Sequence, residues 1–296
     1  MRDAIEPFGW QAVVEARLAE VARGFGAASP ALGLAMADAA LAPGKRFRAK
    51  LLLLAGEATG EAGPAQVDIA CAVELVHTAS LVFDDLPCMD DAKTRRGQPT
   101  THLRHGEARA ILAGIALVTE ALRMLATTRG VDEPTRAALV AVLARAVGPG
   151  GLCAGQDLDL HAAKDAAGIE AEQDLKTGAL FVAGFEMLAL LQGLEEADRS
   201  SLIRLGRRLG RAFQSYDDLL DVEALAADLG KDTGRDRAAS GPARGVLAVQ
   251  DPATARARYE GHMHEIAGIL EGCRFDSRAL AQQIFSVLPR QDLPVS

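Results

Sequence analysis

The chain has 296 residues, of which 49% are hydrophobic and 24% charged, a balance that is typical of globular proteins and excludes a disordered chain or a collagen-like repeat. Acidic residues outnumber basic ones by 40 to 32, and the resulting net charge of −8 disfavours a nucleic-acid-binding protein. The four cysteines form neither a C-x-x-C pair nor a zinc-site spacing, which excludes a disulfide scaffold and indicates a reducing compartment.

No segment has the pattern of a membrane span or a signal peptide. The longest apolar runs, such as Leu51–Ala55 and Ala137–Ala144, are well short of the roughly 20 residues that cross a bilayer. The first residues include Arg2, Asp3 and Glu6 and contain no apolar core followed by a cleavage site. We therefore expect a cytoplasmic protein without a membrane span.

Apolar residues recur with a helical period along most of the chain, while strand-like alternation is absent over any useful length. Gly and Pro residues mark the breaks between the helical segments. Helices are predicted at Ala12–Ala22, Ala31–Ala42, Phe47–Ala58, Pro64–Asp84, Glu107–Ala126, Pro134–Ala146, Glu170–Leu191, Glu195–Asp221, Pro252–Glu271 and Ser277–Val287. No repeat or linker divides the sequence, which predicts an all-α protein with residues 1–296 in one domain.

A first cluster of aspartates, in the sequence DDLPCMDD, begins at Asp84 at the end of a predicted helix. His77, Ser80 and Asp84 are spaced so that they share one face of that helix. Pro87 should end or bend the helix and let Asp90 fold back towards Asp84. The first cluster therefore predicts carboxylates gathered at one helix end.

A second cluster, in the sequence YDDLLD, contains Asp217 and Asp221, which are four residues apart and share a helix face with Gln214 one turn earlier. Neighbouring carboxylates repel one another unless a cation neutralises them. Magnesium binds one or two carboxylates and leaves its other positions to water and phosphate oxygens. Two such clusters favour magnesium sites over solvated acidic turns, and neither has the glycine and glutamate of an EF-hand loop.

Basic residues occur close to these clusters and at a predicted helix start. They are Lys45 and Arg48 in the sequence GKRFR, Arg95 and Arg96 after the first aspartates, Lys176 next to Thr177, and Lys231. A helix N-terminus favours anions, and Arg and Lys side chains bind phosphate oxygens. Acidic clusters for magnesium and basic groups for phosphate together indicate a diphosphate substrate.

The sequence resembles the trans-isoprenyl diphosphate synthases, also called polyprenyl synthetases, and most of all the bacterial geranylgeranyl diphosphate synthases of carotenoid pathways. The resemblance extends from about Gly44 to Asp236 and rests on the motifs GKRFR, DDLPCMDDAKTRRG, GQDLDL, KTG, FQSYDDLLD and GKDTGRD, which occur in the order of the family. It implies an isoprenoid synthase-type helical bundle around a central apolar cavity, and a homodimer.

The resemblance also implies roles for individual residues. Three magnesium ions, bound with the substrate, would be held by Asp84, Asp85, Asp90, Asp217 and Asp221. The diphosphate of the allylic substrate would be bound by Arg95, Lys176, Thr177, Gln214 and Lys231. Isopentenyl diphosphate would be bound by Lys45, Arg48, His77 and Arg96. For His77, the family position agrees with the helix face predicted from spacing.

The implied reaction is a head-to-tail prenyl transfer. The allylic diphosphate ionises, the double bond of isopentenyl diphosphate attacks the resulting cation, and a proton is lost to the released diphosphate. In this family the residues four and five before the first aspartate, here Ser80 and Ala79, help to form the floor of the elongation cavity. Because both are small, we expect geranylgeranyl diphosphate, made by a farnesyltranstransferase, with farnesyl diphosphate as the alternative product.

Two positions depart from the pattern of the family. The lysine that usually follows GKDTGRD is absent, and Arg237 or Arg244 would have to replace it. Ile115 stands where many relatives have a polar residue.

Three other interpretations remain. A terpene cyclase would have no use for GKRFR and Arg96, because it binds a single diphosphate. A non-catalytic partner subunit typically lacks one aspartate motif, whereas both are present here. A purely structural helical protein would not need paired acidic and basic motifs.

Overall fold

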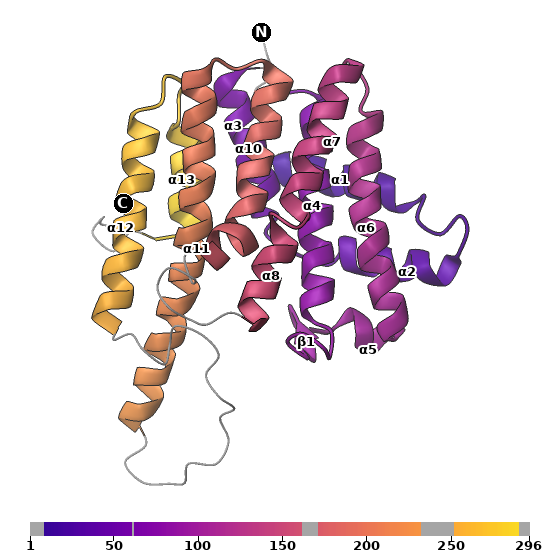
Figure 1. The fold of residues 1–296 in the computed structure, drawn as a ribbon, viewed down its shortest axis with the longest axis horizontal. Coiled ribbons are helices and arrows are strands. Elements are labelled where there is room, and N and C mark those ends of the chain that lie inside the picture. The colour runs from indigo at the N-terminus through magenta and orange to yellow at the C-terminus, as the bar shows by residue number, and fades with distance from the viewer. Residues whose placement is uncertain (1–8, 61, 162–170, 232–251, 290–296) are drawn as a thin grey trace. The chain divides into compact units, whose positions relative to one another are not determined.

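The computed structural model describes residues 9–60, 62–161, 171–231 and 252–289, with the side chains of 221–231 and 252 outside that description. Within these residues the elements are helices, apart from two strands of two residues each (Figure 1). The prediction of an all-α protein is confirmed. The chain forms two compact units, residues 1–147 with 183–199 (the first unit) and residues 148–182 with 200–296 (the second unit). That residues 1–296 make a single domain stays a prediction.

The first unit is built around helix α4. Its elements are α1 (Gly9–Ala22), α2 (Pro30–Ala40), α3 (Phe47–Thr59), α4 (Pro64–Asp84), β1 (Thr94–Arg95), β2 (Gln98–Pro99), α5 (Thr101–His105), α6 (Glu107–Thr127), α7 (Glu133–Val147) and the larger part of α10 (Ala179–Gln192). α4 packs against α1, α2, α3 and α6. It is apolar on most of its faces, as expected for a helix that is surrounded by others. This central position fixes the end of α4, where the first aspartates lie.

Three segments are long and apolar enough to cross a membrane by length and composition alone: Pro64–Asp84, Glu107–Thr127 and Glu133–His161. In the first of these, 67% of the apolar window is buried inside the structure, so packing in the core accounts for its composition. The corresponding fraction for Glu107–Thr127 is 39%, which reflects an exposed apolar face on α6.

The second unit contains α8 (Leu152–His161), the π-helical turn η1 (Asp174–Gly178), the first residues of α10, most of α11 (Glu196–Lys231), α12 (Pro252–Glu271) and α13 (Arg278–Val287). Two glycines allow η1 to pack closely against its neighbours. A Cβ atom on Gly155 of α8 would lie 2.3 Å from the backbone nitrogen of Lys176, and one on Gly210 of α11 would lie 2.4 Å from the Cα of Gly178. These contacts admit no side chain, so they fix η1 between α8 and α11.

Nine of the predicted helices are present, and the tenth, Glu170–Leu191, is replaced within the described residues by the turn η1 followed by α10. Other elements also differ from the sequence-based expectation. The hairpin β1–β2, the short helix α5 and the helix α8 were not expected. In the hairpin, Arg95 pairs with Gln98, and both central residues have positive φ angles, 52° at Arg96 and 76° at Gly97. Such a turn favours glycine, and Arg-Gly is a weaker signal for it than Asn-Gly. Helix α11 continues beyond Asp221 to Lys231, because no proline or glycine lies between Asp221 and Gly230.

Candidate active site

The first aspartate cluster forms a closed turn at the end of α4. The backbone N–H of Asp90 donates to the carbonyl oxygen of Asp84 at 2.9 Å, and the N–H of Asp91 donates to that of Leu86 at 3.1 Å. Leu86 is buried against Val82 and Ala110 of α6, which anchors the turn to the core. The predicted return of Asp90 towards Asp84 is therefore confirmed.

The buried Asp85 forms an ion pair with the partly exposed Arg95 beside this turn. The guanidinium Nε donates to both carboxylate oxygens of Asp85, at 2.8 and 3.0 Å, and Nη2 lies 2.7 Å from Oδ1. Asp85 is only 2% exposed, and its carboxylate is the largest cause of the raised pKa of Arg95. What the structure shows for Asp85 is that it orients Arg95. That it also supports a metal ion stays a prediction.

The GKRFR segment meets α4 and the β1–β2 hairpin on another side. Nη1 of Arg96 donates to the carbonyl oxygen of Pro43 at 3.0 Å, and its guanidinium lies against Gly44. Arg48, on the first turn of α3, places Nη1 3.4 Å from Nε2 of His77 on α4. Lys45 is exposed at the start of the same segment. The structure thus brings three predicted isopentenyl diphosphate residues, Arg48, His77 and Arg96, to one region of the first unit.

Arg46, which the sequence did not single out, holds the GKRFR segment in place. It is 4% exposed and adopts a left-handed backbone conformation with φ 45°. Its guanidinium bonds Glu15 at 2.8 Å and the carbonyl oxygen of Ala40 at 2.8 Å, and lies 3.8 Å from the buried Glu74. A buried arginine needs such partners, because an unpaired buried charge is costly. Arg46 is therefore a structural residue between two predicted ligands of the substrate.

The electrostatic environment of His77 is positive. Desolvation of the imidazole, followed by the charge of Arg48 and then those of Arg96 and Arg95, lowers the pKa of His77 well below its ordinary value of 6.5. Burial and the neighbouring Arg46 likewise lower the pKa of Arg96. Basic side chains that lower one another's pKa in this way favour the binding of an anion.

In the second unit the KTG motif forms η1. Nζ of Lys176 lies 2.6 Å from Oδ2 of Asp159 on α8. On α11, Nε2 of Gln214 donates to Oδ1 of Asp218 at 3.2 Å, and Asp217 is exposed. Because Gly210, which η1 contacts, lies four and seven residues before Gln214 and Asp217, these positions share one face of α11. Close packing thus aligns η1 with the helix face that carries Gln214 and Asp217.

Two ion pairs of the second unit were not predicted from the sequence, and some of the predicted site residues lie outside the described residues. Asp159 belongs to the motif GQDLDL, but nothing in the sequence shows that it pairs with Lys176. The pair between Arg211 and Asp174, with Nε to Oδ1 at 2.6 Å and Nη2 to Oδ2 at 2.7 Å, had no sequence signal either. The side chains of Asp221 and Lys231 and the region of Arg237 and Arg244 are not among the described residues.

Comparison with known proteins identifies the family. The sequence profile described as "Polyprenyl synthetase" matches residues 30–257. The chain belongs to this family. The resemblance to trans-isoprenyl diphosphate synthases is thereby confirmed.

Individual relatives support the same assignment. A geranylgeranyl diphosphate synthase of Pantoea ananas is 42% identical over 210 residues, which cover 69% of this chain and 68% of that protein. A farnesyl diphosphate synthase of Haemophilus influenzae is 38% identical over 207 residues, covering 68% of this chain and 70% of that protein. The solved structure of a geranyltransferase from Legionella pneumophila superposes with a TM-score of 0.84 at 27% identity and covers 97% of each chain. The fold is therefore that of the isoprenoid synthases.

Prenyl diphosphate synthases generally use Mg²⁺, and the first aspartate cluster of this family member fits such an ion. Asp84 and Asp90 offer carboxylate oxygens, the hard ligands that Mg²⁺ prefers, and the closed turn keeps the two residues at one end of α4. Among the described residues no three His, Cys, Asp or Glu side chains form a metal-binding group.

The lowered pKa of His77 predicts a dependence of stability on pH. Below about pH 6.5 the unfolded chain binds a proton at this residue that the folded protein does not, so the free energy of unfolding falls as the pH falls through this range. His77→Gln, which cannot be protonated, should lose less stability than the wild type between pH 7 and pH 5.5 in urea denaturation. The exposed His264→Gln should behave as the wild type. Equal losses in His77→Gln and the wild type would contradict the assignment.

Proposed function

We propose that the protein is a Mg²⁺-dependent head-to-tail prenyltransferase that condenses isopentenyl diphosphate with an allylic diphosphate, by ionisation, condensation and elimination, to give geranylgeranyl diphosphate. The observation that carries this proposal is the pair of cationic side chains Arg48 and Arg96 near His77, next to the aspartate turn at Asp84. Family membership supports the same reaction class. A terpene cyclase would need no second diphosphate-binding region.

In this proposal the residues divide into two groups. Arg48, Arg96 and the neutral His77, with the exposed Lys45, bind the diphosphate of isopentenyl diphosphate. Arg95, held in position by Asp85, donates to the allylic diphosphate. The chemistry that Mg²⁺ supplies when bound to the aspartates is charge neutralisation of the leaving diphosphate.

The resemblance to the family also gives proposed roles to residues of the second unit. Lys176, Thr177 and Gln214 bind the same diphosphate, and Asp217 shares the magnesium ions. Asp159 holds the ammonium group of Lys176 in its observed position. Asp221 and Lys231 complete the proposed set. A dry, apolar cavity that protects the allylic cation from water is part of the proposal and follows from the chemistry.

The product length is proposed from two small residues on α4. Ala79 is completely buried, and Oγ of Ser80 is turned back to the carbonyl oxygen of His77 at 2.9 Å. Neither residue carries a bulky group that would shorten the cavity. The alternative is farnesyl diphosphate, since a farnesyl diphosphate synthase is also among the similar proteins.

A homodimer in the cytoplasm completes the proposal. The four cysteines are free thiols, as expected in a reducing compartment. Large apolar side chains are exposed along α6, with Ile111 41%, Leu112 54% and Ile115 53% exposed, and a contiguous apolar patch of this kind marks an interface. The departure at Ile115 enlarges this apolar face.

Light scattering at micromolar concentration should give twice the mass of the chain, and a monomeric mass would contradict the proposed dimer.

Product analysis tests the reaction and its length. The purified protein, given Mg²⁺, isopentenyl diphosphate and primers of five, ten and fifteen carbons, should form a twenty-carbon product and accept the fifteen-carbon primer. Ser80→Phe should shift the product to fifteen carbons, because the ring would occupy the cavity floor. Ser80→Ala is the matched control and should keep the twenty-carbon product. No product from any primer would contradict the proposed reaction, and an unchanged length in Ser80→Phe would place the floor elsewhere.

The proposed magnesium ligands can be tested against a neighbouring aspartate. Asp84→Asn and Asp90→Asn should each lower kcat/KM by about 100-fold or more, as removal of a group that stabilises developing charge does. Asp91→Asn is the control, because Asp91 is paired with the exposed Lys93 and has a φ of 49° that asparagine tolerates. Steady-state kinetics over a range of Mg²⁺ concentrations would measure the effect. A loss in Asp91→Asn equal to that in Asp84→Asn would contradict the assignment.

A further inference from the structure

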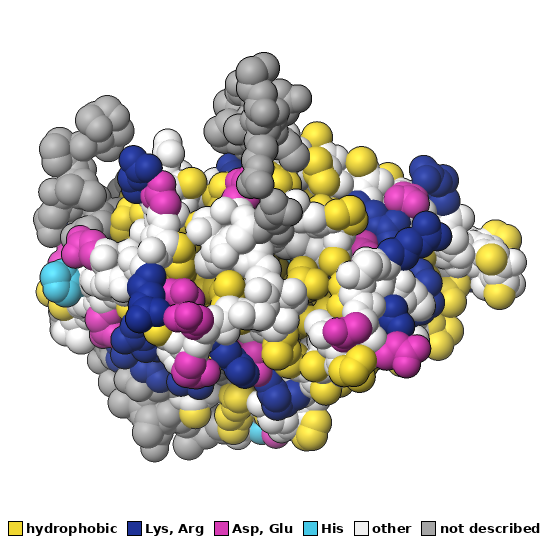
Figure 2. All heavy atoms as spheres, turned by 90° about the horizontal axis from the view of Figure 1, so that it is seen from above, with side chains coloured by type: hydrophobic (Ala, Val, Ile, Leu, Met, Phe, Trp, Pro, Cys, Tyr) yellow, Lys and Arg dark blue, Asp and Glu magenta, His cyan; other side chains and the backbone are white. Residues whose placement is uncertain are grey.

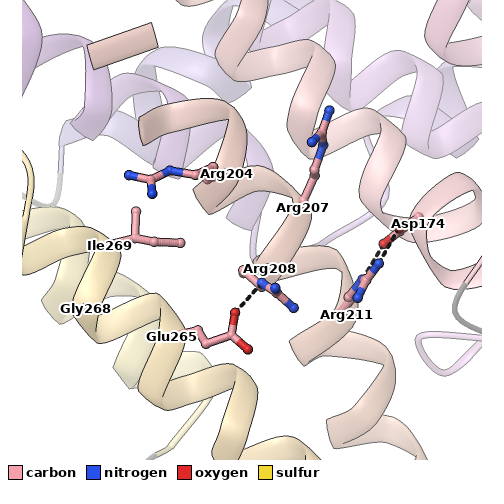
Figure 3. Close-up of a pocket in the computed structure, with 8 residues that line it drawn as sticks. All are labelled: Asp174, Arg204, Arg207, Arg208, Arg211, Glu265, Gly268 and Ile269. Carbon is pink, nitrogen blue, oxygen red and sulfur yellow. Dashed lines mark hydrogen bonds and ion pairs between the residues drawn. The ribbon is translucent and has the colours of Figure 1, made fainter. Parts of the chain in front are cut away.

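The second unit contains a basic cavity between α11 and α12 (Figure 3). Its volume is about 560 Å³, within the range of sites for small molecules. Its charged lining consists of Arg204, Arg207, Arg208, Arg211, Asp174 and Glu265. The predicted substrate residues do not line this cavity.

The four arginines come from a single stripe of α11. Their spacings of three, four and seven residues put them on one side of the helix, where like charges repel. Asp217 is six residues after Arg211, and at 3.6 residues per turn the two side chains point about 120° apart around the axis. The arginine stripe is thus offset from Asp217, whereas Gln214, three residues after Arg211 and seven after Arg207, lies along the stripe.

Two of the four arginines have carboxylate partners. Nε of Arg208 lies 2.6 Å from Oε2 of Glu265 on α12, and Arg211 is paired with Asp174 at 2.6 and 2.7 Å. Arg204, which extends towards Ile269 of α12 in Figure 3, and Arg207 are both exposed at the edge of the cavity. Neither has a hydrogen-bond or ion-pair partner among the described residues. Four guanidinium groups against two carboxylates leave two positive charges in the lining.

His262 on α12 gives a second sign of unbalanced positive charge. It is three and seven residues before Glu265 and Ile269, so it lies on the helix face that borders the cavity. Its Nδ1 atom is buried and has no hydrogen-bond partner in the described part of the chain. Burial and then the charge of Arg208 lower its pKa, with Arg211 and Arg258 adding to the effect and Glu265 opposing it.

Charged side chains of opposite sign lie together on other parts of the surface. On the face that Figure 2 shows, Lys and Arg side chains lie in several groups next to Asp and Glu side chains. The chain as a whole is acidic, with a net charge of −8. A cavity with two unpaired arginines in such a protein is a local excess of positive charge that a dianion would balance.

We propose that the cavity between α11 and α12 binds a small anion that carries a phosphate or diphosphate group, with Arg204 and Arg207 as its main ligands. The planar guanidinium fork matches phosphate oxygens and is the preferred group for them. Gly268 and Ile269 of α12 leave an uncharged wall next to the arginines. This site is separate from the proposed prenyl transfer and does not depend on it.

Binding can be followed at His262 in the full-length protein. The imidazole signals of the six histidines would be recorded by NMR, and that of His262 assigned with His262→Gln. Orthophosphate, inorganic diphosphate and an allylic diphosphate would be titrated separately, to distinguish a free anion from a prenylated one. A bound anion should raise the pKa of His262 saturably, because it offsets the neighbouring guanidinium charges.

The variant Arg204→Gln with Arg207→Gln should weaken this response about tenfold or more, while the response of His77 to the same compounds is retained. Arg23→Gln with Arg129→Gln removes two exposed arginines elsewhere, with the same change in net charge, and should respond as the wild type. A response to any of the three compounds that is lost only in the first variant supports the site. No saturable response to any of them, or an equal response in both double variants, would overturn the proposal.

Discussion

Neutralisation of like charges at the end of α4 is the constraint on which the candidate site depends. The aspartates of this turn repel one another. The arginines in and next to the GKRFR segment also repel one another. Asp85 is satisfied by Arg95, and Arg46 is satisfied by Glu15 and the buried Glu74. These ion pairs neutralise Asp85 and Arg46, whereas the other charged side chains of the region can interact with ligands. The packing that stabilises the first unit therefore also forms its anion-binding region.

In the second unit close backbone packing has the corresponding role. Gly155 and Gly210 let η1 approach α8 and α11 more closely than any side chain would allow. Lys176 is then held by Asp159, and the KTG turn is aligned with the face of α11 that bears Gln214 and Asp217. A larger residue at either glycine would displace η1 and with it the proposed allylic diphosphate ligands.

Helix α11 carries residues of both proposed anion-binding sites. Gln214 and Asp217 are proposed for the reaction, and the arginine stripe, which continues to Gln214 along the helix, is proposed for the second site. Arg211 pairs with Asp174, the first residue of η1, two residues before Lys176. The arginine cavity and the KTG turn therefore share a structural element, although their ligating residues differ.

The sequence by itself determined most of the helices, the aspartate motifs and the family, because these depend on local periodicity and short spacings. It also predicted the turn that returns Asp90 to Asp84, since a proline after a helix end leaves few alternatives. Only the tertiary structure decided that Arg46 is structural whereas Arg48 contacts His77, and that Arg204 and Arg207 lack the carboxylates that Arg208 and Arg211 have. Those distinctions depend on partners such as Glu74, Asp174 and Glu265, which are distant in sequence and are brought close only by packing.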